Sequence, residues 1–146
     1  MEEHVGALWH RLITRLADNN FPQAAVSLAE VEKTVAVLFR ALGGDGGLQI
    51  SNAEQIENRA RRSWLQRVAG SQEKTARAWR DDDFLRLPAR IDCLPDAQLN
   101  RDLYLWLAAL AVPPVPPNGD WFVLNQQRTR ATLRRWPGLT ARYRRL

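Results

Sequence analysis

The feature that most constrains this chain is an uninterrupted apolar run of ten residues, Leu103 to Val112. A helix that is apolar on every side has to be covered on every side, so we expect it at the centre of a helical bundle. Asp96 is a good N-cap for this helix, and the prolines from Pro113 onward end it and form a stiff spacer over residues 113–119. Ten residues are about half of what a membrane-spanning helix needs, so the run predicts a protein core, and we expect no membrane partner.

Earlier in the chain, apolar residues recur at helical spacing in two segments. A first helix is expected over about residues 3–18 and a second over about residues 23–42. Ser27 and Glu30 have the spacing of a capping box, which would start the second helix as late as residue 28. Gly43 and the glycine after it would close this helix by supplying a left-handed cap. The seam of this helix against a neighbour is expected at Leu28, Val31, Val35, Leu38 and Leu42.

The remaining segments complete a mainly α fold. A third helix is expected from Ser51 or Asn52 to Ala69, a further one ends at about Arg135, and a last one runs over residues 137–146. Residues 75–87 fit either a helix or a small β-hairpin, because Pro88 disfavours helix at the residue before it. We therefore predict a single bundle of five to six helices, with the hairpin around residues 75–87 left open.

Charge is unevenly distributed along the chain. The net charge is +5, and 19 of the 21 basic residues are arginine. Residues 1–105 carry a net charge of −1, and residues 106–146 carry a net charge of +6. A basic half of this kind fits nucleic acid, an anionic membrane surface or an acidic protein face. On a helix, Arg128 and Arg135 share one side while Arg130 and Arg134 share another, so they form no single stripe, and this favours an acidic protein over nucleic acid.

The residues that could carry catalysis or bind metal are few and scattered. His4 and His10 are six residues apart and so point to different sides of a helix. Cys93 has no histidine near it in sequence and is expected to be a small buried thiol. The side chains of Asp81–Asp83 are expected to be solvated. The glycine-rich segment Gly43–Gly47 lacks the Lys-Ser/Thr that closes a phosphate loop. We therefore expect no enzyme activity, no metal and no cofactor. A single cysteine fits a reducing compartment. Met1 is followed by Glu2 and Glu3, whereas a signal peptide begins with basic residues. Both observations favour the cytoplasm.

Two tryptophans that are flanked by arginines are candidates for contact with a partner. Tryptophan and arginine dominate the energetics of protein interfaces. For each residue alone, core packing with the arginine head in water is the competing interpretation. The candidate partner-binding residues are Arg61, Arg62, Trp64, Arg67, Arg77, Trp79 and Arg80.

Several stretches taken together carry a family resemblance. They are Trp9 to Arg15, Arg61 to Arg67 with Ala69 and Gly70, Leu87 and Pro88 with Ile91, Leu99 to Leu110, and Trp136 to Leu139 with Tyr143. This ensemble covers nearly the whole chain and resembles the N-terminal region of the CbbO/NorD family. Family members carry a C-terminal von Willebrand factor A domain and work with a hexameric MoxR-type AAA+ ATPase.

The resemblance implies an adaptor rather than an enzyme. In CbbO it implies Rubisco activation, in which the CbbQ hexamer hydrolyses ATP to remove inhibitory sugar phosphates and CbbO brings that motor to Rubisco. In NorD it implies maturation of nitric oxide reductase. The stretches do not separate the two, and we favour CbbO, with a NorD-type factor as the alternative and an arginine-rich nucleic-acid-binding module as the alternative from another class.

One departure from the family pattern bears on the domain organisation. The Asp-x-Ser-x-Ser motif that holds metal in a von Willebrand factor A domain does not occur in this sequence. We therefore expect residues 1–146 to be one N-terminal adaptor domain of a longer protein. This domain would dock on a CbbQ-like hexamer, and the client, Rubisco, would be bound by the C-terminal domain.

Overall fold

The structure is a computed structural model that describes residues 20–52, 84–113 and 121–146. These residues form four α-helices, two short 3-10 helices and four short strands, so the predicted mainly α class is confirmed. Four is fewer than the predicted five or six helices. The helix predicted over residues 3–18 and most of the one predicted up to Ala69 lie outside the described residues.

Helix α2, Leu28–Ala41, follows the 3-10 helix η1, Pro22–Ala24, and the strand β1, Val26–Ser27. The Glu30 carboxylate accepts hydrogen bonds from the Ser27 backbone N–H at 3.2 Å and from the Ser27 hydroxyl at 2.8 Å, which places the start of the helix at the later predicted position. The two bonds also lower the pKa of Glu30, the hydroxyl contributing most.

The buried stripe of α2 differs from the predicted seam at its C-terminal end. Leu28, Val31 and Val35 are buried as expected, but the next buried residue is Phe39 and not Leu38. A straight helix has 3.6 residues per turn, so its core side drifts away from a strict 3-4-3-4 repeat.

A glycine pair closes α2 as predicted. Gly43 has a φ of +92°, a backbone conformation that costs glycine little. Its N–H donates to Arg40 O at 3.0 Å, and the Gly44 N–H donates to Phe39 O at 2.9 Å, which together form a Schellman motif. A Cβ on Gly44 would overlap the Phe39 ring.

The strands correct one prediction and leave another untested. Strand β2, Gln49–Asn52, pairs in parallel with β3, Phe84–Leu87, while β1 pairs antiparallel with β4, Arg90–Ile91. Residues 84–87 are extended, with residues 49–52 as their partner among the described residues, and the rest of the possible hairpin around 75–87 lies outside the described residues. The third helix does not begin at Ser51 or Asn52, because both residues pair in β2. Parallel strands need a long crossover, and residues 53–83 supply its length.

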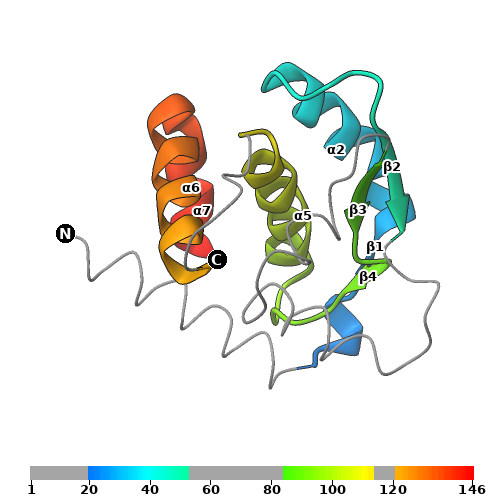
Figure 1. Cartoon of the computed structure of the whole chain (residues 1–146). Helices are drawn as coiled ribbons and strands as arrows, with labels where there is room; N and C mark the ends of the chain where they lie inside the picture. Colours follow the sequence, from blue (N-terminus) through cyan, green and yellow to red (C-terminus); the bar gives the residue numbers. More distant parts are fainter. Residues whose placement is uncertain (1–19, 53–83, 114–120) are drawn as a thin grey trace.

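Helix α5, Ala97–Ala111, is the central element, as its apolar run predicts. It contacts α2 and the strands on one side, and helices α6, Trp121–Arg135, and α7, Thr140–Arg145, on the other (Figure 1). Asp96 caps it by accepting hydrogen bonds from the N–H groups of Gln98 at 2.6 Å and Leu99 at 3.3 Å.

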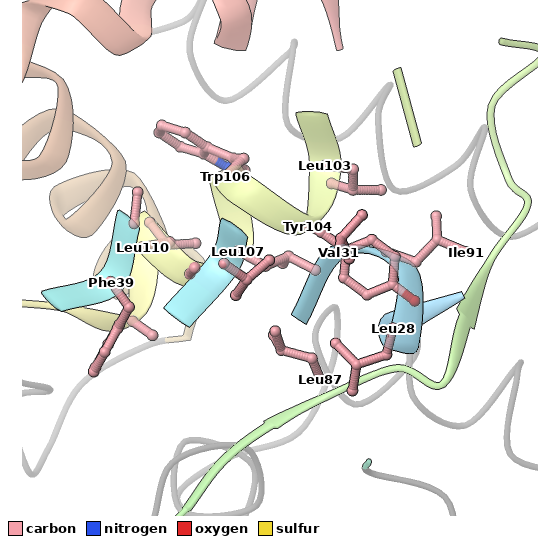
Figure 2. Packing of buried hydrophobic residues seen from close by; sticks show 14 of the residues in the cluster. Leu28, Val31, Phe39, Leu87, Ile91, Leu103, Tyr104, Trp106, Leu107 and Leu110 are labelled. Carbon is pink, nitrogen blue, oxygen red and sulfur yellow. The ribbon is translucent and has the colours of Figure 1, made fainter. Parts of the chain in front are cut away.

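The core is built around the apolar face of α5. Leu103, Leu107 and Leu110 pack there with Phe39 and Leu87 from other elements (Figure 2). Trp106, which is only 1% exposed, lies on the opposite side of α5 from Tyr104. The predicted chain break at Trp136–Gly138 is present, as the short 3-10 helix η2, Pro137–Leu139, which leads into α7. The core therefore has α5 at its centre, with α6 and α7 on the side away from the strands.

Candidate functional site

All seven partner-binding residues predicted from the sequence lie within residues 53–83, outside the described part of the chain. Their role stays a prediction. The described residues offer a different candidate, formed by α6, η2 and α7 and by the polar contacts that fasten them to α5.

Two polar side chains on one side of α5 fasten it to the strands. Asn100 is completely buried, and its Nδ2 donates to Ala24 O at 2.8 Å and to Leu94 O at 3.0 Å. Its Oδ1 accepts the Leu94 N–H at 3.1 Å. One turn later, the Tyr104 hydroxyl donates to Pro88 O at 2.8 Å. These bonds satisfy backbone groups that would otherwise be buried without partners, so the two side chains serve the fold.

The other side of α5 carries a buried carboxylate that holds α7. Asp102 is 0% exposed, and its Oδ1 lies 3.0 Å from Nε of Arg142. Nη2 of Arg145 donates to Oδ2 at 3.1 Å, and Nε2 of Gln98 donates to Oδ1 at 3.3 Å. The side chains of Arg142 and Arg145 are 35% and 60% exposed. One buried anion therefore meets two cations that keep access to water.

Ring packing completes the attachment of α7. The Tyr143 ring lies 4.5 Å from the Trp106 ring between centroids, tilted by 39°, and burial raises the pKa of the Tyr143 hydroxyl. A helix of six residues is not stable alone in water. Helix α7 therefore forms because it packs on α5.

Arg128 on α6 caps the end of α5. It is 7% exposed, and its Nη2 donates to Leu110 O at 2.6 Å. In a continuing helix this carbonyl would accept from residue 114, but Pro114 has no N–H. The guanidinium supplies the missing donor. Arg128 is therefore not part of an exposed basic face, which corrects its pairing with Arg135 in the sequence analysis.

The exposed arginines of this layer lie at the C-terminal ends of α6 and α7. Arg134, Arg135 and Arg144 are exposed, and the guanidinium carbon of Arg135 lies 5.2 Å from the centroid of the partly buried Trp136 ring. We call Arg134, Arg135, Trp136 and Arg144 together the arginine layer. Cations in the last turn of a helix interact favourably with its dipole, and the basic side chains remain available to a partner.

The described residues include one of the reactive or metal-binding candidates considered from the sequence, Cys93. Cys93 is buried as predicted, and burial, with Asp92 adding to it, raises the pKa of its thiol to about 12. No group of three or more His, Cys, Asp or Glu side chains in residues 20–52, 84–113 and 121–146 could hold a metal. His4, His10 and Asp81–Asp83 fall outside those ranges. Among the helices described, none has the length and apolar character to cross a membrane.

Comparison with known proteins gives close relatives. The chain is 40% identical over 146 residues to the protein NorD of Stutzerimonas stutzeri and 37% identical over 158 residues to NorD of Brucella abortus. It is also 44% identical over 146 residues to an uncharacterized protein of Pseudomonas aeruginosa. Each match includes 100% of this chain. The whole chain is therefore similar to one part of the proteins named NorD.

The chain spans about a quarter of the length of these relatives: 24% of the Stutzerimonas and Pseudomonas proteins and 25% of the Brucella protein. No family model matches the chain, and no solved structure matches it. The expected resemblance to the CbbO/NorD family is thus supported on the NorD side, and the preference for CbbO gains no support.

The sequence patterns did not reveal the two residues that fasten α6 and α7 to α5, Asp102 and Arg128. A signal for Asp102 was available, because it is the one acid directly before the apolar run, where every side of the helix is expected to be covered. A signal for Arg128 was weaker: the prolines after Val112 leave carbonyls without partners, but they do not say which donor fills the gap.

Proposed function

We propose that this chain is a docking domain of a NorD-type factor that works with a MoxR-type AAA+ ATPase in the maturation of nitric oxide reductase. The observation that carries the proposal is the similarity of the whole chain to proteins named NorD, at 37–40% identity. The domain holds the ATPase, and ATP hydrolysis takes place in that partner.

The described interior supports a docking role rather than a catalytic one. Three completely buried polar side chains of α5 are committed to the fold: Asn100 and Tyr104 bond to backbone carbonyls, and Asp102 pairs with two arginines of α7. A catalytic group has to reach a substrate, whereas these three side chains are completely buried.

The Rubisco role expected from the resemblance is replaced by the NorD role. The relatives with a functional name are called NorD. The nucleic-acid alternative is also weakened, because Arg128 is buried and Arg142 and Arg145 pair with Asp102. Fewer cations then remain to neutralise phosphates, the source of most non-specific affinity for nucleic acid.

Binding of the purified ATPase tests the proposal directly. The chain is mixed with the MoxR-type ATPase hexamer of a nitric oxide reductase system and, separately, with a CbbQ-type hexamer, and co-elution is measured by gel filtration. We expect co-elution with the first hexamer. Stronger binding to the CbbQ-type hexamer would reinstate the Rubisco interpretation, and binding to neither would refute the docking role.

A graft tests the same role in cells. In Stutzerimonas stutzeri, the part of NorD that matches this chain is replaced by the chain itself, and nitric oxide reductase activity is measured. Activity is expected to approach that of the parent strain. The control is the same graft with Leu107→Asp, which places a charge in the core and should abolish activity. A stably produced graft without activity would count against the proposal.

A further inference from the structure

The C-terminal segment of the chain is a purely cationic surface element. Residues 121–146 contain seven arginines and no aspartate or glutamate. The Arg128 side chain donates to the Leu110 carbonyl at the end of α5, and Arg142 and Arg145 both form ion pairs with Asp102. Arg134, Arg135 and Arg144 are exposed, and no aspartate or glutamate within residues 121–146 could pair with them.

The exposed acids of the described residues all lie elsewhere. Glu30 and Glu32 are on α2, Asp45 is in the turn after it, and Asp96 caps the start of α5. Helices α6 and α7, which carry these arginines, lie on the far side of α5 from the strands (Figure 1), but Nη2 of Arg135 lies 3.8 Å from the position that a Cβ on Gly43 would take at the end of α2. Among the described residues, α6 and α7 therefore expose arginines and carry no acid of their own, a charge distribution that favours approach to a partner of opposite charge.

We propose that the arginine layer, Arg134, Arg135, Trp136 and Arg144, is the docking surface for a protein face of clustered carboxylates. This inference rests on the proposed function and names the surface through which the ATPase is held. Arginine presents a planar fork that matches a carboxylate with two hydrogen bonds. The Trp136 ring beneath Arg135 provides the apolar contact that is typical of interface hot spots.

A protein partner fits this surface better than a duplex. The arginine layer has three exposed cations, and Arg134 and Arg135 are neighbours at the end of one helix while Arg144 is on another. A phosphate backbone is best met by a row of cations along a groove. Neighbouring arginines next to an aromatic ring, as at Arg134, Arg135 and Trp136, are better matched by a carboxylate cluster.

A purely structural role for these arginines has to be separated from docking, because each lies in the last turn of its helix, where cations favour the helix dipole. Glutamine removes the charge but keeps a good helix propensity. The test variant is therefore Arg134→Gln, Arg135→Gln and Arg144→Gln together. The matched control is Lys33→Gln, Arg40→Gln and Arg101→Gln, which removes the same charge from exposed positions on α2 and α5.

Both variants and the parent chain are titrated against the MoxR-type ATPase hexamer, and separately against a duplex DNA of about 20 base pairs, after thermal melts show that they fold. We expect the layer variant to bind the hexamer at least about tenfold more weakly, and the control to change by less than about twofold. Equal binding by the two variants would overturn the inference and leave the proposed function standing. Failure of the parent chain to bind the hexamer would refute both, and so would a charge-dependent affinity confined to the DNA.

Discussion

The contact between Asp102 and α7 supports a sharp prediction about stability. Replacement of Asp102 by asparagine removes the anion but leaves Arg142 and Arg145 able to turn into water, since their side chains are 35% and 60% exposed. Replacement of both arginines by alanine instead leaves a completely buried carboxylate with only the Gln98 amide. The two changes break the same contacts, and we expect the second to cost more.

The magnitudes follow from the burial of the groups. Hydrogen bonds to charged groups contribute about 1.5–3 kcal/mol, and exposed ion pairs contribute about 0–1 kcal/mol. Because the cations are partly exposed, we expect Asp102→Asn to lower the free energy of unfolding by about 2 kcal/mol. Loss of both partners from a buried charge costs about 3–5 kcal/mol, so Arg142→Ala with Arg145→Ala should cost about 4 kcal/mol.

Urea unfolding at pH 7.5, followed by circular dichroism, measures these differences. The triple variant with asparagine at 102 and alanine at 142 and 145 should be more stable than the double arginine variant, because the buried charge is gone. Arg144→Ala serves as the control and should change stability by less than about 0.5 kcal/mol. If the double arginine variant costs no more than Asp102→Asn, the carboxylate is not a buried charge that depends on α7, and the reasoning fails.

Three further predictions concern other parts of the described structure. Burial raises the pKa of the Cys93 thiol to about 12 in the folded chain. Between about pH 9 and pH 12 the unfolded chain loses this proton while the folded chain keeps it, so the free energy of unfolding falls as pH rises. Cys93→Ala should remove about 1.4 kcal/mol of this loss between pH 8 and pH 10, measured by urea unfolding at both pH values. Gly44→Ala should cost about 1–3 kcal/mol in the same assay, because the new Cβ overlaps an aromatic ring, while Gly46→Ala, where a Cβ meets nothing within 4 Å, should be near neutral. Arg128→Met should cost about 1.5–3 kcal/mol by leaving Leu110 O without a donor and should increase hydrogen exchange in the last turn of α5; unchanged exchange there would count against the capping role.

The helices that carry their own start and stop signals were predictable from the sequence. Helix α2 begins beside Ser27 and ends at Gly43, and α5 begins after Asp96 and ends before the prolines. Each of these signals acts within a few residues, so the sequence alone determines the local geometry. The central position of α5 also followed from the sequence, because a helix that is apolar on every side has to be covered on every side.

The strand pairs were not predictable in the same way. Residues 49–52 contain Ile50 between polar neighbours and carry no strong β pattern, and their partner, residues 84–87, is more than thirty positions away. A short parallel pair is stabilised by what covers it rather than by its own propensity. Local patterns therefore extended the next helix into Ser51 and Asn52, and they did not reveal residues 49–52 as the partner of Phe84–Leu87.

The polar residues of α5 explain how a helix with few distinguishing apolar features is fixed in one orientation. Apolar burial is non-directional, so the leucines and alanines of the run would tolerate rotation of α5 about its axis. Asn100 and Asp102 are two residues apart and hence about 200° apart around the helix; the first bonds to η1 and the loop after β4, and the second bonds to α7. Rotation of α5 would break bonds on both sides at once. Because the Asp102 side chain is completely buried and Arg134 is exposed, changes at Asp102 should act on stability and changes at Arg134 on docking, which makes the two properties separable by experiment.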